Sequence, residues 1–167
     1  MSTLQVNRFE NTSGVAYGTV LQVVNTLNTT YSSSATTMPV DDTIPQSTEG
    51  FEILSASITP KSASNKLKIT VFANISCSTA SGVGVGMALF QDSGTSAIAC
   101  SISSFYNTGA VLNIPLVYYM NAGTTSSTTF KVRAGCNSGS TYVNGNNTTR
   151  ILGGTAVSSI TIEEIQV

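Results

Sequence analysis

The chain of 167 residues is long enough to enclose one hydrophobic core and short for two, so its length predicts a single domain. Only 9% of the residues are charged, against about a quarter in an ordinary soluble domain. A formal net charge of −1 without a basic cluster argues against nucleic acid as a partner and against membrane insertion. Serine and threonine, 24 of each, supply the polar surface instead, and they favour turns and exposed strand faces over helix interiors.

Residues 1–14 precede the strand-like part of the chain and predict a short extended arm, with residues 15–167 forming the domain. The arm contains the apolar residues Leu4, Val6 and Phe9, with Arg8 between the last two. A free arm of this composition is disordered unless it binds something. We therefore expect these four residues to attach the domain to a larger assembly.

Alternation of apolar and polar residues predicts about eight β-strands in the domain and no helix. The clearest is the segment 66–76, in which every second residue from Leu67 to Ile75 is apolar. In chain order, the expected strands are 18–27, 50–58, 66–76, 83–89, 97–103, 112–118, 130–134 and 156–167. Turns rich in Asn, Asp, Ser and Gly separate them. This spacing predicts a single antiparallel β-sandwich or jelly roll, and it leaves the topology open.

The longest interval without a strand pattern runs from residue 28 to residue 49. It is rich in Ser and Thr and contains two prolines and the adjacent acids Asp41 and Asp42. Loops of this length are either functional or poorly ordered, and in an oligomer they often lie across a neighbour. Two interpretations stay open: a binding loop, or an extended edge segment over 37–40 that pairs with the sheet.

Glycine occupies every second position from Gly82 through Gly84 to Gly86, with valines between. One face of this strand therefore has no side chains, and another backbone or a bulky side chain can approach it closely. We expect these three glycines to lie at an oligomer contact. The alternative is a phosphate-binding loop, which is disfavoured because the spacing is not GxGxxG and no lysine follows.

The apolar parity of the last expected strand changes around Glu163 and Glu164, from Ile162 before them to Ile165 after them. A one-residue shift of this kind moves the apolar side chains to the other face of a sheet. A β-bulge or a change of buried face is therefore expected near the C-terminus.

The three cysteines, Cys77, Cys100 and Cys136, are odd in number and lack a Cys-x-x-Cys spacing, and the chain has no histidine. We therefore expect no metal site of the zinc type. Cys77 and Cys136 each lie in an alternating apolar run, where a free thiol behaves as a small hydrophobic side chain. We expect both to be inert free thiols in the core.

Without histidine, neither a Ser-His-Asp triad nor a Cys-His pair can form, so we expect no enzyme and no cofactor. The alternative enzyme is a glycan hydrolase that uses Asp41 or Asp42 with Glu52. A calcium site at the two aspartates would lack the other residues of a calcium-binding loop.

Residues 2–14, which begin Ser2-Thr3-Leu4 and end Thr12-Ser13-Gly14, resemble the N-terminal start of bacteriophage tail-fibre proteins. The segments 18–24, 56–67 and 153–164 resemble the distal β domains of the same proteins. The resemblance implies a homotrimeric, jelly-roll-like knob on a virion surface, assembled in the host cytoplasm. It implies a short tail or baseplate fibre whose arm binds other virion proteins. A capsid decoration protein and a carbohydrate-binding module are the alternatives.

A trimer would also hide apolar strand faces that one thin sandwich leaves exposed. Host attachment through a surface glycan is the function that such a knob would serve. Its expected contacts are loop aromatics and amides, with ordinary turn residues as the alternative: Tyr106, Asn107, Tyr142, Asn144 and Asn146.

Overall fold

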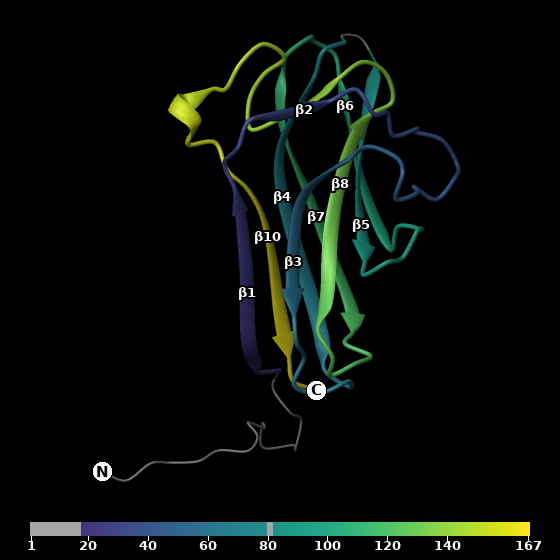
Figure 1. Cartoon of the computed structure of the whole chain (residues 1–167), viewed down its shortest axis with the longest axis vertical. Helices are drawn as coiled ribbons and strands as arrows, with labels where there is room; N and C mark the ends of the chain where they lie inside the picture. Colours follow the sequence, from purple (N-terminus) through teal and green to yellow (C-terminus); the bar gives the residue numbers. More distant parts are fainter. Residues whose placement is uncertain (1–17, 80–81) are drawn as a thin grey trace.

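The computed structural model describes residues 18–79 and 82–167, and the predicted arm with Leu4, Val6, Arg8 and Phe9 lies outside them. The described part is an elongated sandwich of two β-sheets whose strands run along the long axis (Figure 1). Within this part, no helix is long and apolar enough to cross a membrane. The predicted all-β fold is confirmed.

The described residues form ten strands and one 3₁₀ turn, which are joined by loops. They are β1 (Val20–Asn28), β2 (Ser32–Ser34), β3 (Phe51–Ile58), β4 (Lys66–Cys77), β5 (Val83–Gln91), β6 (Ala99–Phe105), β7 (Val111–Asn121), β8 (Thr128–Cys136), β9 (Thr141–Val143), η1 (Leu152–Gly154) and β10 (Ser158–Ile165). All eight predicted strands are present with ends shifted by a few residues. The short β2 and β9, which are too short to show an alternating pattern, were not predicted.

The two sheets are wound as a jelly roll. One sheet has the order β1-β10-β4-β9-β2, with β7 paired to the other edge of β4, and the second has the order β3-β8-β5-β6. Strands from the two ends of the chain are thus neighbours, as where β1 pairs antiparallel with β10. This arrangement confirms the predicted fold class and supplies the topology that the spacing left open.

The core lies between the two sheets. Every second residue of β4 from Leu67 to Ile75 is fully buried, in agreement with the alternation of the sequence. These side chains share one cluster with Met87 of β5 and Phe130 of β8. Burying one such side chain contributes roughly 1.5–3 kcal/mol, so these residues hold the sheets together.

Cys77 and Cys136 form a disulfide, and the prediction of two free thiols is wrong. Cys77 ends β4 in one sheet and Cys136 ends β8 in the other, at the same end of the sandwich. Both side chains point into the core, and their Cα atoms lie 6.5 Å apart. Sequence spacing did not reveal the pair, because 59 residues separate the two positions and only the fold brings them together.

Glu164 corrects the prediction for the C-terminal strand. The pairing of β10 with β4 runs without interruption, and the register shift lies on the other neighbour, between Val20 and Gln22 of β1. Glu164 continues the buried face of β10 as a fully buried carboxylate. The change of parity is only apparent, because the charged Glu164 lies on the same buried face as Ile160 and Ile162.

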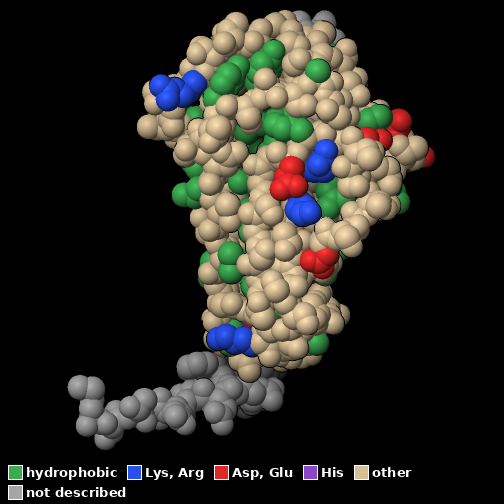
Figure 2. Space-filling view, in the orientation of Figure 1, with side chains coloured by type: hydrophobic (Ala, Val, Ile, Leu, Met, Phe, Trp, Pro, Cys, Tyr) green, Lys and Arg blue, Asp and Glu red, His purple; other side chains and the backbone are tan. Residues whose placement is uncertain are grey.

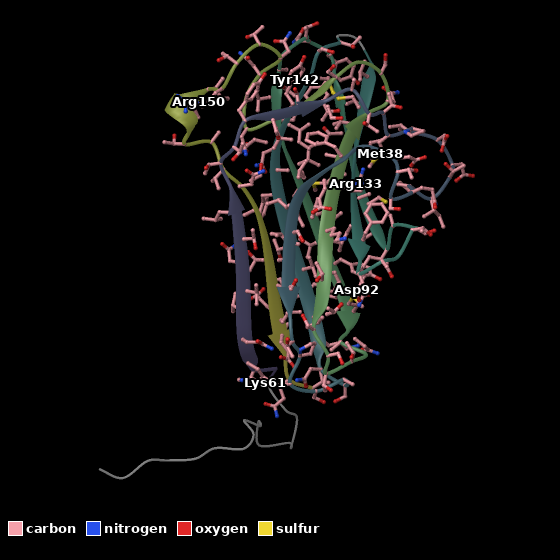
Figure 3. All side chains as sticks on the ribbon, in the orientation of Figure 1. Met38, Lys61, Asp92, Arg133, Tyr142 and Arg150 are labelled. Atoms are coloured by element: carbon pink, nitrogen blue, oxygen red, sulfur yellow. A yellow bond between two sulfur atoms is a disulfide. The ribbon has the colours of Figure 1, made fainter. Side chains whose placement is uncertain are left out.

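Four donors satisfy the buried Glu164 carboxylate. The side chains of Asn65 and Gln22 donate to it over 2.6 Å each, and the backbone N–H groups of Lys61 and Ser62 donate over 2.8 and 3.3 Å. Burial by itself raises the pKa of Glu164, but these hydrogen bonds together hold it below its ordinary value. The carboxylate thereby fastens the turn after β3, and Gln22 of β1, to the end of β10, near the label of Lys61 in Figure 3.

Candidate functional site

The outward side of the six-stranded sheet carries an open apolar surface, which we call the outer face. It consists of Val23 and Leu27 of β1, Phe72 of β4, and Pro115, Val117 and Tyr119 of β7. These positions alternate with buried residues on β4 and β7 and with half-buried residues on β1, so they point away from the core. The large side chains remain exposed, from 44% for Phe72 to 62% for Leu27.

The strand register arranges these side chains in rows across the sheet. Leu27 lies opposite Ser159, Ser159 opposite Phe72, and Phe72 opposite Pro115, so one row spans four strands. Cross-strand neighbours in such a row lie about 4.5–5.5 Å apart, which is close enough for contact. The outer face is therefore one continuous surface.

The ion pair of the outer face lies two rows farther along the sheet. Lys68 and Glu163 lie side by side on β4 and β10, with 2.7 Å between Nζ and Oε2. The hydrogen bond to Glu163 and the attraction between the two charges hold the pKa of Lys68 above its ordinary value. The two opposite charges cancel, so the pair adds no net charge to the outer face.

Thr70 lies between these rows, and its hydroxyl has no partner. Its Oγ1 atom is shielded from solvent and makes no hydrogen bond with any described residue. An unsatisfied buried hydroxyl costs free energy and usually has an explanation elsewhere. Because this oxygen is shielded from solvent, it does not mark a contact with a partner on the outer face.

The structure contradicts the predicted oligomer contact at Gly84 and Gly86. A Cβ atom at Gly84 would lie 2.9 Å from Val40, and one at Gly86 would lie 2.6 Å from Sδ of Met38. The bare face of β5 is thus filled by the chain's own loop (Figure 3). Gly82 lies outside that cover, in a turn with φ of +75°, where an added Cβ would meet no described atom within 4 Å.

The segment 37–40 therefore lies across the outward surface of the four-stranded sheet and not at its edge. Met38 donates its backbone N–H to the carbonyl of Cys136 over 3.1 Å, and its side chain is almost completely buried. The sequence contained the signal for this packing, since alternate glycines do accept a bulky side chain. It did not indicate which side chain.

The predicted host-facing loops gather at the end of the sandwich opposite to the start of β1 (Figure 1). Tyr106 is 75% exposed, whereas Tyr142 is half-buried and stacks on Tyr31 with 6.3 Å between ring centroids. Asn146 accepts hydrogen bonds from the backbone of Thr148 within its own turn. Nothing in the structure tests a contact of these residues, or of the exposed Asn107, with a host surface, so that role stays a prediction.

Asn144 cannot take the predicted role, because it is fully buried. Its side-chain amide donates to the carbonyls of Asn28 and Thr30 over 2.8 and 3.2 Å, and its oxygen accepts from Ser158 over 2.8 Å. Asn144 adopts a positive φ of 58°, which asparagine tolerates better than most residues. It is a structural amide that joins three segments.

The carboxylates predicted for the alternative function, a glycan hydrolase, do not lie in one site. Asp41 and Asp42 line one cavity and Glu52 lines another. Hydrogen bonds from the Thr43 hydroxyl and backbone N–H hold the pKa of Asp41 below its ordinary value. Across residues 18–79 and 82–167, no group of three or more His, Cys, Asp or Glu side chains is placed to hold a metal ion.

The fold and the outer face together define a jelly-roll β-sandwich with one open apolar sheet surface. The chain belongs to the family of the Pgp3 C-terminal domain, whose family model matches residues 15–167. Comparison with curated proteins gives no significant match.

Two solved structures are similar in outline. One is Eiger TNF from S. frugiperda, with 10% identity, a TM-score of 0.47, and coverage of 86% of this chain and 93% of that one. The other is the VP2 subviral particle of infectious bursal disease virus, with 14% identity, a TM-score of 0.37, and coverage of 97% of this chain and 43% of that one. Similarity at this level assigns neither an activity nor an assembly to the chain.

The family match corrects the functional prediction. The expected phage tail or baseplate fibre, with its alternatives of capsid decoration protein and carbohydrate-binding module, is wrong, because the matched family is that of the Pgp3 C-terminal domain. What the resemblance predicted correctly is the β jelly roll. It failed on function because turn-rich β domains with similar motifs serve many roles. No finding tests the predicted location on a virion surface.

Proposed function

We propose that this domain is a non-catalytic assembly module that forms a homotrimer through the outer face of its six-stranded sheet. The observation that carries the proposal is the row from Leu27 through Phe72 to Pro115, continued by the exposed Val117 and Tyr119. Several large apolar side chains exposed on one sheet face are more typical of an interface than of a free surface.

A closed ring suits the direction of the strands. The strands of the outer face run along the long axis of the sandwich (Figure 1). Three copies with parallel long axes can each turn this face toward a common axis, and the ring then leaves no unpaired copy of the face.

The chemistry of the chain supports a role without catalysis. The sequence has no histidine, and its acids on the loop 38–45 and on β3 line separate cavities. General acid–base chemistry needs its groups within hydrogen-bonding reach of one substrate atom. Binding through an extended surface is the function that this arrangement supports best.

Sedimentation of the full chain tests the proposal. The wild-type protein is expected at three times the 17.3 kDa mass of one chain. Val117→Asp places a charge in the outer face and is expected to give monomers, because a buried unpaired carboxylate costs several kcal/mol at an interface. The matched control is Leu152→Asp on the turn η1, which projects from the sandwich (Figure 1) and where the wild-type side chain is 73% exposed.

Far-UV circular dichroism should show that both variants keep the β fold. A wild-type monomer at micromolar concentration, or a Val117→Asp protein with unchanged mass, contradicts the proposal.

A further inference from the structure

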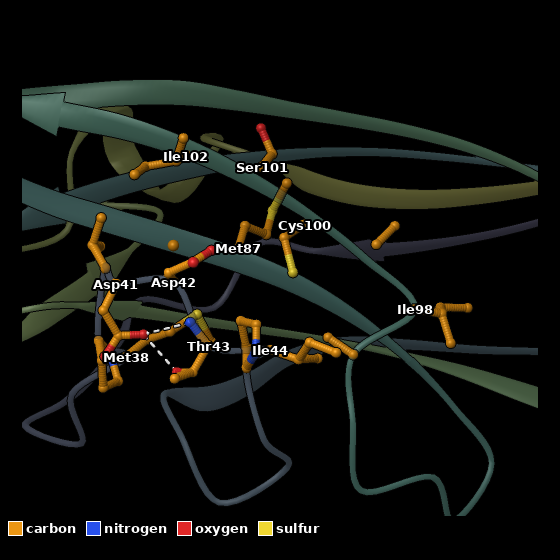
Figure 4. A pocket seen from close by; sticks show the side chains of 16 residues that line it. Met38, Asp41, Asp42, Thr43, Ile44, Met87, Ile98, Cys100, Ser101 and Ile102 are labelled. Atoms are coloured by element: carbon orange, nitrogen blue, oxygen red, sulfur yellow. Dashed lines mark hydrogen bonds between the residues drawn. The ribbon is translucent and has the colours of Figure 1, made fainter.

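A groove of about 470 Å³ lies on the four-stranded side of the sandwich, between the loop 38–45 and β6 (Figure 4). The loop forms one wall, and the residues from Ala97 to Ile102 form the other. This volume lies within the range of pockets that bind a ligand or a few side chains. The outer face belongs to the other sheet, so a site in this groove is independent of the proposed homotrimer.

The groove is part of the fold, because hydrogen bonds fix both ends of the loop. At one end, the backbone N–H of Gly50 donates to the carbonyl of Thr37 over 2.9 Å, and Met38 is bonded to β8. At the other end, the backbone N–H of Ala97 donates to the carbonyl of Pro45 over 2.9 Å. Between these anchors the loop arches over the sheet and leaves space beside β6.

The groove is apolar along most of its length. Ile44 and Ile102 border it and remain 62% and 59% exposed. Figure 4 shows Asp41 near Ile102, Ile98 at the opposite end, and the thiol of Cys100 between them. The wall from Ile98 to Ile102 spans about 13 Å in an extended chain. An extended segment of about five residues would therefore cover the groove from end to end.

The acidic end of the groove has no cation of its own. Oδ1 of Asp41 accepts hydrogen bonds from Thr43, whereas its Oδ2 and both carboxylate oxygens of Asp42 make no hydrogen bond with the described part of the chain. None of the residues that line the groove is a lysine or an arginine. Because opposite charges attract at short range, an occupant with a basic side chain at this end is complementary to the groove.

The backbone of β6 is open beside the same groove. Among the described residues, β6 pairs only with β5, and it contains no charge, proline or register shift. The other long edges each have a protective feature. A register shift interrupts β3 beside Glu52, Pro115 lies in β7, and a register shift follows Val20 in β1. Unprotected edges of this kind bind extended segments by strand addition.

We infer that the groove binds an extended segment of another protein, which pairs with β6 as an added strand of the four-stranded sheet. The segment carries apolar side chains at alternate positions, which enter the groove, and a lysine or arginine at the end beside Asp41 and Asp42. A second copy of this chain that paired through its own β6 would bring no basic residue to that end, because β6 has none. Charge therefore favours a different partner.

Selection of displayed random peptides of about nine residues against the full chain tests the inference. The enriched peptides are expected to alternate apolar and polar residues and to keep a lysine or arginine at one constant position. The matched control target is the same protein with Cys100 alkylated by a bulky maleimide, which fills the groove and leaves the outer face unchanged. Equal enrichment on both targets, or no enrichment on the unmodified protein, would overturn the inference.

N-methylation of a selected peptide distinguishes strand addition from side-chain contacts alone. Only every second N–H of an added strand faces β6, so methyl groups at these positions should weaken binding about tenfold or more, and methyl groups at the intervening positions far less. Fluorescence anisotropy measures both affinities. A saturating peptide should also slow the alkylation of Cys100 by iodoacetamide about tenfold. Equal effects at the two sets of positions, or an unprotected Cys100, would contradict strand addition at this edge.

A single substitution tests the acidic end. Asp42→Asn should weaken the peptide about threefold or more at low salt, and high salt should reduce this difference. The matched control is Glu52→Gln, which removes an exposed carboxylate from the other cavity and should leave the affinity unchanged. Neither residue belongs to the core, so both variants are expected to keep the fold. If Asp42→Asn binds as tightly as the wild type, the charge assigned to the partner is wrong.

Two further results decide between occupants and between surfaces. Rapid formation of Cys100–Cys100 dimers by the wild-type protein under mild oxidation would show that a second copy occupies the edge, and this result would overturn the inference. Val117→Asp should bind the selected peptide as tightly as the wild type, because the outer face takes no part in this site. A failure of the homotrimer and a failure of the groove are thus distinguishable.

Discussion

The outward surfaces of the two sheets differ in whether the chain itself covers them. On the four-stranded sheet, Gly84, Gly86 and Gly135 leave a depression, and the chain fills it with Met38 and Val40. Figure 2 shows this side of the molecule, where hydrophobic and charged side chains are scattered among backbone and other side chains.

On the six-stranded sheet, large apolar side chains such as Phe72 and Tyr119 are present and nothing in the described chain covers them. The comparison teaches that a bare glycine face signals close packing without telling which segment packs there. A surface that keeps large apolar side chains exposed is the better indication of a partner.

The largest expected effect concerns the bond that holds the two sheets together at one end. Replacing Cys77 and Cys136 by serine, or reducing their disulfide, should lower the free energy of unfolding by about 4 kcal/mol, because a 59-residue separation makes the closed loop long. Urea denaturation with and without reductant measures this loss. Cys100→Ser is the control and should leave the midpoint unchanged. Equal stability with and without reductant would mean that the thiols are free, as the sequence spacing indicated.

Glycine-to-alanine substitutions on the covered surface of the four-stranded sheet should destabilise the fold by amounts that depend on which atoms the added Cβ meets. Gly135→Ala brings a Cβ to 2.9 Å from the backbone of Gly50 and of Met38, so it should cost about 2–3 kcal/mol. Gly86→Ala meets only the flexible side chain of Met38 and should cost about 1 kcal/mol. Chemical denaturation of both variants provides the comparison. If the two variants are equally stable, the loop does not pack on this sheet as described.

The outer face depends on β1, which Glu164 helps to fasten. Glu164→Gln should cost about 2 kcal/mol, since an amide cannot accept all four hydrogen bonds that the carboxylate accepts. The folded-state pKa of Glu164 is lowered, so its contribution is fully present above the unfolded pKa of about 4.3 and is lost as the pH falls through the folded pKa.

Thermal unfolding between neutral and acidic pH measures this contribution. The wild-type protein should lose more stability than Glu164→Gln as the solution is acidified. Parallel curves for the two proteins would show that the carboxylate is not ionised in the fold.

The smallest effect on the single chain is expected from the open surface itself. Val117→Ala should change the free energy of unfolding of the monomer by no more than about 0.5 kcal/mol, because the side chain is 54% exposed and touches the core little. Its effect should appear in the dissociation constant of the assembly, measured by dilution. A large loss of monomer stability would mean that Val117 serves packing within the chain.

Much of the fold could be predicted from the sequence, because a half-buried strand must alternate. The period of two in β4 predicted its buried residues one by one, from Leu67 to Ile75. The same rule failed at Glu164, where a charged side chain takes an apolar position because distant donors satisfy it. Alternation reports where a side chain points, and it reports nothing about partners from other segments.

The site could be predicted less well, for the same physical reason. The glycines of β5 indicated a close approach, but the approaching residue, Met38, is supplied by a loop whose path depends on the whole fold. The alternation predicted for 112–118 did not indicate the outer face, because its apolar residues, such as Ile114 and Leu116, face the core and the outer face has the opposite parity. The continuation of the outer face onto β1 depends on the pairing of the first and last strands. Long-range pairing is the information that local patterns lack.

One measurement tests the central claim, that the outer face of the six-stranded sheet is the surface covered in the assembled protein. In a Cys100→Ser background, a cysteine introduced in place of Val117 and one introduced in place of Leu152 are labelled with a thiol reagent. In a single chain the two wild-type positions are similarly accessible, at 54% and 73% exposure. In the assembled protein, the cysteine that replaces Val117 is expected to react at no more than about one tenth of the rate of the cysteine that replaces Leu152, because assembly buries it. Similar rates at the two positions would contradict that claim.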